Sequence, residues 1–177
     1  MRGRIATWFA LAAVALVSLP AAANAAPKLL IFPIDMQIPR TEMDFFMAPQ
    51  GPSPAEQERI KKANAELAKL VAADGRYEVI DLAPYAEEIA EKQPIYECNG
   101  CEIDIGQKAK ADFLMVCVMN KISETHLSLS VALVDVAKNG VVSNSSVLVQ
   151  GNTDDAWLHG VRWLARNRLL VAEGKPQ

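Results

Sequence analysis

Hydrophobic and polar positions alternate over residues 127–133, and this two-residue period predicts a β-strand with two unlike faces. Every second side chain there is apolar: Leu127, Leu129, Val131 and Leu133. The side chains between and before them are polar or small: His126, Ser128, Ser130 and Ala132. We therefore expect one face on a core and the other toward water or a thin cover. The preceding stretch, residues 113–122, is apolar at nearly every position, which is typical of a central strand covered on both faces.

A third strand is predicted over residues 141–150, directly after a Lys-Asn-Gly turn at residues 138–140. An Asn-Gly pair accepts the positive φ angles that a tight hairpin turn needs. The polar run at residues 143–146 places this third strand nearer an edge of the sheet. Because the three strands follow one another with short connections, we expect an antiparallel meander.

A long helix is predicted from Pro54 to the residue before Gly75. Ser53 and Glu56 form a capping box around a proline at the first helical position, and glycine is a common left-handed helix end. Apolar residues recur within it at helical spacing and make one buried stripe: Ile60, Ala63, Leu67, Leu70 and Val71.

This helix lies between two predicted strands, residues 28–34 and residues 77–82, and Pro33 indicates that the first of them ends irregularly. A strand–helix–strand unit of this length favours a right-handed βαβ unit with parallel strands. A shorter helix follows from Pro84 to about Lys92, and its expected inward residues are Ala86, Ile89 and Ala90. The sequence thus predicts an α/β (α+β) fold: a mixed sheet from a βαβ unit plus a C-terminal three-stranded antiparallel meander, covered by helices that include the C-terminal one.

The last helix is predicted from Ala156 to about Val171, with Asn152 or Thr153 as its cap. Its expected sheet-facing residues are Trp157, Leu158, Val161, Leu164, Ala165 and Leu169. Trp163 follows Trp157 by six residues, which is about 240° around a helix. We therefore expect Trp157 to be buried and Trp163 to be the more exposed of the two.

Two surfaces are candidates for partner binding. His159, Trp163 and Arg166 recur at helical spacing, and Trp and Arg are frequent binding hot spots, although the same spacing fits an ordinary solvated face. The other candidate is the aperiodic loop over residues 35–52, which contains three methionines and the pair Phe45-Phe46. Long loops in compact domains are often functional, but this phenylalanine pair could equally fold back over the sheet.

The chain begins with a pattern typical of a secretory signal peptide. Arg2 and Arg4 precede an apolar stretch over residues 5–19, and Ala23-Asn24-Ala25 fits a small-x-small cleavage site. That stretch is shorter than the roughly 20 residues that span a membrane, and no second such stretch follows. We expect cleavage after Ala25, a periplasmic location, and one globular domain over residues 26–177.

Three cysteines are the main candidates for chemistry. Cys98 and Cys101 form either a local structural disulfide, which an oxidising compartment allows, or a redox-active pair. No histidine directly follows Cys101, so c-type haem attachment is excluded. Two histidines in the chain are too few for a convincing zinc site. Cys117 lies in the predicted central strand, where it is expected to be a small buried residue.

Catalytic motifs are missing from the sequence. It contains no Gly-x-Ser-x-Gly elbow, no phosphate-binding loop and no dinucleotide fingerprint. The net charge of −3 argues against a general nucleic-acid binder, which would need a basic face. We expect no catalytic residues, no metal and no cofactor.

Several stretches resemble known families. LLIFPI, YEVIDL, ADFLMVCVM and VALVDVAKNG are similar to the amino-terminal domain of TolB and to related periplasmic assembly proteins. GRYEVIDLAP, CNGCE, KADFLMVCVMNKIS, LSLSVALVDV and QGNTDDAWLHGVRWL resemble a family of small exported bacterial proteins that is known as a domain of unknown function. That resemblance covers nearly all of the chain after residue 25, and it implies an association with quinoprotein (PQQ-dependent) dehydrogenase systems.

The sequence supports two hypotheses about function. The first is a non-enzymatic periplasmic binding or accessory protein that serves a quinoprotein dehydrogenase or envelope assembly through a periplasmic protein partner. The alternative is a thiol–disulfide redox protein that uses Cys98 and Cys101.

Overall fold

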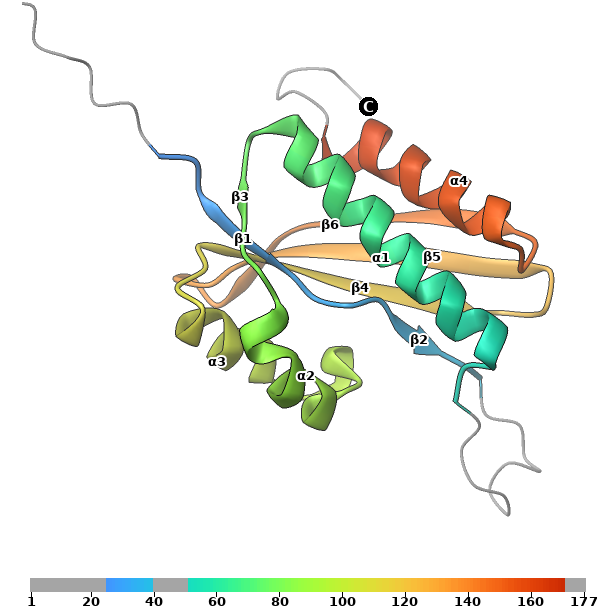
Figure 1. Cartoon of the computed structure of the whole chain (residues 1–177), viewed down its shortest axis with the longest axis horizontal. Helices are drawn as coiled ribbons and strands as arrows, with labels where there is room; N and C mark the ends of the chain where they lie inside the picture. The colour runs from blue at the N-terminus through green and yellow to red at the C-terminus, as the bar shows by residue number, and fades with distance from the viewer. Residues whose placement is uncertain (1–24, 40–50, 171–177) are drawn as a thin grey trace, which may run out of the picture.

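The computed structural model describes residues 25–39 and 51–170 of the 177-residue chain, and within them one six-stranded sheet carries helices on both faces (Figure 1). The strands are β1 (Lys28–Ile31), β2 (Asp35–Gln37), β3 (Glu78–Val79), β4 (Phe113–Lys121), β5 (His126–Asp135) and β6 (Gly140–Gln150). The helices are α1 (Pro54–Asp74), α2 (Ala86–Lys92), α3 (Cys101–Lys108) and α4 (Asp154–Leu164). None of the helices described could cross a membrane, because none is both long and apolar enough.

The sheet is mixed, as the sequence predicts. Its order is β3-β1-β4-β5-β6, and β2 pairs with β4 farther along the same side as β1. β1 pairs in parallel with β3 and β4, while β4, β5 and β6 form the expected antiparallel meander. Asn139 in the last turn has a φ of 47°, which is the positive angle expected there. β6 is an edge strand, as its polar centre indicated.

The first strand is shorter than predicted and is followed by a second. β1 ends at Ile31, and β2 begins at Asp35, which the sequence analysis placed in a loop. Pro33 has no N–H for the ladder and interrupts it. The N–H of Ile34 donates instead to Asn64 Oδ1 of α1 at 2.9 Å. The chain then rejoins β4 as β2.

Two predictions after α1 need correction. β3 contains only Glu78–Val79, not residues 77–82, because Asp81 turns the chain by accepting a hydrogen bond from the Ala83 N–H at 3.0 Å. The helix predicted from Pro84 begins as a 3₁₀ turn and becomes α2, in which Ala86 and Ala90 are exposed. Ile89 alone of its expected inward residues is buried, because a seven-residue helix presents only a narrow stripe to the sheet.

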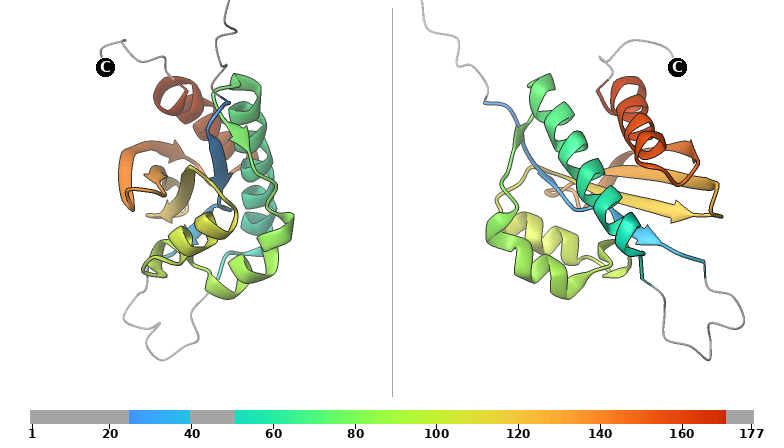
Figure 2. Two further views of the ribbon diagram at one scale, coloured as in Figure 1. Left: turned by 90° about the vertical axis from the view of Figure 1, so that its left-hand side faces the viewer. Right: turned by 45° about the vertical axis from the view of Figure 1, so that its right-hand side comes forward.

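Helices α1 and α4 cover one face of the sheet and enclose the larger core (Figure 2). Leu67 of α1 and Trp157 of α4 are buried there with Leu129 of β5. The alternation in β5 and the burial of Trp157 are thus confirmed, and Leu133 is only partly buried. α4 approaches the sheet through Gly160, where a Cβ would lie 2.6 Å from Val149 Cγ2.

Helices α2 and α3 cover only part of the other face. Ile105 of α3 is buried there with Leu114 of β4 and Val134 of β5. Farther along β5 and β6 on the same face, Ser130 is only partly buried and Asn144 is exposed. We call this uncovered area the open half-face, and it positions the groove described next.

Candidate functional site

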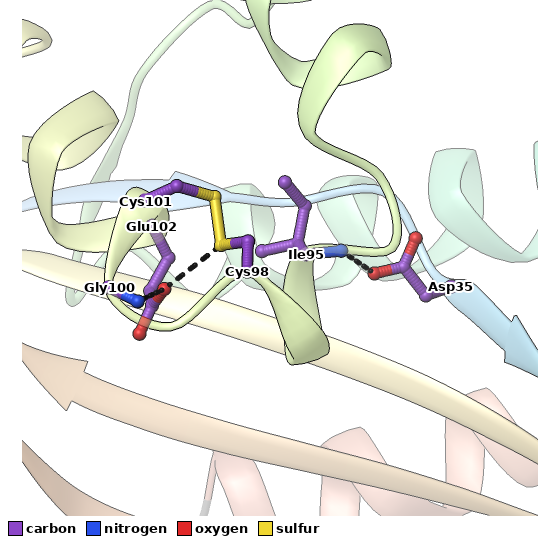
Figure 3. The surroundings of a disulfide bond; sticks show 6 residues. All are labelled: Asp35, Ile95, Cys98, Gly100, Cys101 and Glu102. Carbon is purple, nitrogen blue, oxygen red and sulfur yellow. Dashed lines mark hydrogen bonds between the residues drawn. A yellow bond between two sulfur atoms is a disulfide. The ribbon is translucent and has the colours of Figure 1, made fainter.

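A loop that contains the disulfide borders the open half-face. This disulfide loop, residues 93–102, follows α2 and leads into α3. It is attached to the sheet through Asp35, whose carboxylate accepts a hydrogen bond from the Ile95 N–H at 2.6 Å (Figure 3). Gln93 Nε2 donates to the same carboxylate at 3.2 Å. Asp35 is almost fully buried. Its burial raises the pKa, against the hydrogen bonds from Ile95, Tyr96 and Gln93 that lower it.

Cys98 and Cys101 form a disulfide in this loop, with their Cα atoms 5.6 Å apart. Asn99 and Gly100 between them both have positive φ angles, 54° and 106°, which makes the tight turn that brings the sulfurs together. Glu102 accepts a hydrogen bond from the Gly100 N–H at 3.1 Å, and its Oε2 lies 3.4 Å from Cys98 Sγ (Figure 3). The loop is therefore fixed by a covalent bond at one end and by Asp35 at the other.

A groove of about 370 Å³ separates the disulfide loop from the open half-face. The loop contributes Ile95, Tyr96, Asn99 and Glu102 to its lining. The sheet contributes Val116, Val118, Ser130, Ala132, Val134, Val141 and Asn144. Mostly small or β-branched side chains form the floor, and polar side chains stand at the loop side.

The strand register explains why the floor of the groove has small side chains. Val118, Ser130 and Ser146 stand side by side across β4, β5 and β6. Two serines in that row keep the sheet surface low, so the groove remains open between the loop and the edge strand. Of the β5 positions expected to face water or a thin cover, Ser130 and Ala132 line this groove.

Among the residues that line the groove, Glu102 is the only carboxylate, and no histidine, lysine or arginine is present. A general acid–base pair needs two titratable groups within reach of one substrate, and a nucleophile needs a neighbouring base. Besides Glu102, the lining contains two hydroxyl side chains, those of Tyr96 and Ser130, so it holds few groups for such chemistry. It offers apolar contact with a few hydrogen-bonding groups at the rim, which is the chemistry of binding.

A second cavity, of about 570 Å³ and lined mostly by polar residues, lies beside the N-terminus of α1. Four of its lining residues, Glu56, Arg59, Lys121 and Asn152, form a cluster with Asp154, which pairs with Arg59. We call these five residues the Glu56 network. Glu56 is buried and accepts hydrogen bonds from Lys121 Nζ at 2.9 Å, Asn152 Nδ2 at 2.8 Å and the Ser53 N–H at 2.8 Å. Burial alone would raise the pKa of Glu56, but these hydrogen bonds lower it to about 2.

Other contacts of the Glu56 network join α1 to α4. Asn152 Oδ1 accepts from Trp157 Nε1 at 3.1 Å and from Arg59 Nη1 at 3.2 Å. Arg59 also pairs with Asp154 at 3.1 Å. Thr153, the other candidate cap, caps α4 by accepting from the Ala156 N–H at 3.3 Å. Because each charged group of the Glu56 network has a close partner, we assign the network a structural role, which is to connect α1 to α4.

The patch predicted on the last helix lies away from the groove. His159, Trp163 and Arg166 are all exposed, and Trp163 retains 38% exposure, as expected for the outer tryptophan. The guanidinium of Arg168 lies 5.8 Å from the Trp163 ring centre, so this tryptophan already has a cationic neighbour. α4 covers the face opposite α2 and α3 (Figure 2), so the fold does not bring the patch and the disulfide together. Phe45 and Phe46 lie outside the described residues.

The Cys98–Cys101 pair could be identified from the sequence, but the residues that position it could not. Asp35 gave no signal, since it is an isolated acid after an apolar run. Glu56 was identified only as part of a capping box. That box is present in the structure, and the same side chain also binds Lys121 and Asn152.

Comparisons with known proteins concern the family and the fold. The DUF3280 family model, described as "Protein of unknown function (DUF2380)", matches residues 34–169. No curated protein sequence matches significantly. The LpoB C-terminal domain from Salmonella enterica has a TM-score of 0.50 and 12% identity, covering 73% of this chain and 86% of that chain. A PelC dodecamer from Paraburkholderia phytofirmans has a TM-score of 0.50 and 14% identity, covering 88% and 96%. TolB from Acinetobacter baumannii has a TM-score of 0.40 and 11% identity, covering 80% and 28%.

Proposed function

Since this chain belongs to the family described as "Protein of unknown function (DUF2380)", we propose its function from its own surface. It is a non-enzymatic periplasmic accessory protein that binds a protein partner in the groove beside the disulfide. The groove carries this proposal. It combines a rim that is tied down by the disulfide and by Asp35 with a mostly apolar floor and a single carboxylate.

The form of the groove favours a protein segment over a small molecule. Small-molecule sites usually enclose most of the ligand surface. This groove is open toward β6, where Val141 is 65% exposed. An extended segment could lie along such a floor, with Val116, Val118 and Ala132 beneath it and polar groups of the disulfide loop at its side.

Export is the second part of the proposal. A disulfide persists in oxidising compartments such as the periplasm, and the chain begins with the pattern of a cleavable signal peptide. The expected cleavage follows Ala25. Fractionation of cells that produce the full chain, followed by N-terminal sequencing of the periplasmic product, tests this part directly.

A groove-filling variant tests the binding proposal. Ala132→Trp would occupy the floor of the groove, and Ala137→Trp, at an exposed position in the turn after β5, is the matched control. We expect the wild-type chain and the control to capture the same protein from a periplasmic extract, and Ala132→Trp to lose it. Equal capture by all three chains would contradict the proposal, as would capture of nothing together with turnover of any substrate.

The identity of the partner belongs to the same experiment. The sequence resemblance implies a quinoprotein dehydrogenase, and envelope assembly proteins are the other class expected. Mass spectrometry of the captured protein distinguishes them. A groove-dependent partner from neither class would retain the binding role and remove the quinoprotein hypothesis.

Thiol–disulfide exchange is the second candidate function, and one observation favours it. Cys98 and Cys101 are only partly buried, next in sequence to the groove residues Asn99 and Glu102, and Cys101 begins α3. A helix N-terminus stabilises a thiolate. The Glu102 carboxylate beside Cys98 acts in the opposite direction. A reduction potential between about −120 and −270 mV, the range of known exchange catalysts, would support redox activity. We expect a value below about −300 mV, which marks a structural bridge.

A further inference from the structure

The two edges of the sheet are protected very differently. β3 at one edge has two residues, Glu78 and Val79. β6 at the other edge has eleven residues, GVVSNSSVLVQ, with no charged side chain and no proline. Within the described part of the chain no strand pairs with the outer side of β6 (Figure 2). Natural proteins usually protect an open edge by charge, proline, shortness or a bulge. Of these, β6 has a bulge near its start, where Val142 has no partner in β5.

Exposed apolar side chains concentrate on this same strand. Val141, Val142 and Leu148 are 65%, 55% and 65% exposed. They stand near the two ends of β6, and the polar residues 143–146 lie between them. An apolar–polar–apolar pattern on an open edge indicates a surface that is covered by something with the same pattern.

A second copy of β6 has that pattern in antiparallel orientation. If a two-fold axis passes beside Ser145, Val142 lies opposite Leu148 of the second copy and Asn144 lies opposite its Ser146. Each contact occurs twice, as in any two-fold interface. The apolar ends thus cover each other, and the polar centres meet.

We propose that this protein forms a two-fold symmetric dimer in which β6 pairs antiparallel with β6 of a second copy. The two sheets become one continuous sheet. A two-fold axis between antiparallel strands is perpendicular to the sheet, so the grooves of both copies open on the same side of the dimer. The helices α4 do not compete for space, because each packs on the Val147 and Val149 end of its own strand, and these ends lie apart in this register.

The oligomeric state of the chain from residue 26 onward tests the proposal, by analytical ultracentrifugation over a wide range of concentration. We expect a wild-type dimer that dissociates on dilution. The double variant Val142→Lys/Leu148→Lys should be monomeric with an unchanged circular dichroism spectrum. Ile122→Lys, at an apolar position that is 60% exposed but outside β6, should remain dimeric. A monomeric wild type, or a double variant that still dimerises, would overturn the proposal.

A charge exchange tests the register. The variant Val142→Glu/Leu148→Glu should also be monomeric alone, because like charges meet twice across the axis. Mixed with the lysine double variant, it should form a heterodimer. If mixing leaves both chains monomeric, the antiparallel β6 register is wrong.

A cysteine on the axis gives an independent reading. Ser145→Cys should cross-link to its symmetry mate under mild oxidation, because directly opposite Cβ atoms in antiparallel strands are about 5 Å apart. Ser143→Cys, two residues away, should cross-link far less. Equal cross-linking of the two variants would contradict an axis at Ser145. Capture of another protein's strand by a wild type that remains monomeric would replace self-pairing with strand addition.

Discussion

Single residues of β5 determine which of its faces belongs to the core. Leu129 is fully buried, and Ser130 beside it lines the groove. Leu129→Ala should therefore reduce the free energy of unfolding by about 2–5 kcal/mol, since it leaves a cavity. Ser130→Ala should change it little. Urea unfolding of both variants measures the difference, and a more damaging Ser130→Ala would mean that the strand register is shifted by one residue.

Glu56 makes stability depend on pH. Its folded-state pKa of about 2 lies below the ordinary glutamate value of 4.5, so its stabilising contribution is present above the unfolded pKa and is lost as the pH falls toward 2. A shift of this size corresponds to about 3 kcal/mol. Wild type should lose that stability between about pH 5 and pH 2, and Glu56→Gln should be less stable at pH 7 but less sensitive to acid.

Chemical unfolding at pH 7 and pH 3 distinguishes this effect from general acid sensitivity. Glu58→Gln is the matched control, because the Glu58 side chain is 61% exposed and its salt bridge is to its helix neighbour Lys61. The control should follow wild type at both pH values. If Glu56→Gln also follows wild type, the Glu56 network contributes no net stability.

Burial of single residues could be predicted from the sequence, but their hydrogen-bond partners could not. Burial of Leu129 and Trp157 follows from local period, because a strand or helix imposes its own spacing on the side chains. The partners of Asp35 and Glu56 do not, since Ile95 is 60 residues from Asp35 and Lys121 is 65 residues from Glu56. Such contacts depend on how elements are placed in space, which no local pattern of one sequence records.

At the scale of elements, α4 has two tryptophans with different tasks. Trp157 is fully buried and donates to Asn152, while Trp163 is 38% exposed. Trp157→Ala should cost about 3–5 kcal/mol of unfolding free energy, and Trp163→Ala should leave stability nearly unchanged. Thermal unfolding tests both variants, and iodide should quench the fluorescence of Trp163 before that of Trp157. Similar losses in the two variants would remove the exposed patch as a binding candidate.

Another element, the disulfide loop, depends on one acid from β2. Asp35→Ala would leave the buried Ile95 N–H without its acceptor, at a cost of about 1–3 kcal/mol. We expect faster amide hydrogen exchange at Ile95 and Tyr96, with little change in α1 and α4. Asp35→Asn retains one acceptor oxygen and should have a smaller effect. Uniformly faster exchange across the chain would show that Asp35 supports the whole fold and not the loop alone.

Element boundaries were less predictable than element types. The predicted strand over residues 28–34 is interrupted at Pro33 because Ile34 finds an acceptor in α1, and the predicted strand over residues 77–82 ends early because Asp81 turns the chain. In both places a polar side chain competes with the ladder for a backbone group. The groove was not predictable either, since it results from a loop and three strands that meet only in the folded chain.

At the scale of the whole molecule, the two hydrophobic cores should hold the fold without the disulfide. The bridge closes a loop between residues only three apart in sequence, so its removal costs at most about 2 kcal/mol by the chain-entropy relation. The double variant Cys98→Ser/Cys101→Ser should therefore fold, with a modestly lower unfolding temperature, while the groove partner binds less tightly. A chain that fails to fold would show that the bridge is required for the smaller core.

Two of the three buried carboxylates among the described residues, Asp35 and Glu56, respond to acid in opposite directions. The pKa of Glu56, on the α1 side, is lowered to about 2, and that of Asp35, on the side of the disulfide loop, is raised. Acid therefore weakens the joint between α1 and α4 but removes the cost of a buried charge beneath the disulfide loop. A falling pH should therefore destabilise the layer of α1 and α4 and stabilise the layer of the disulfide loop, so that acid acts in opposite directions on the two faces of one sheet.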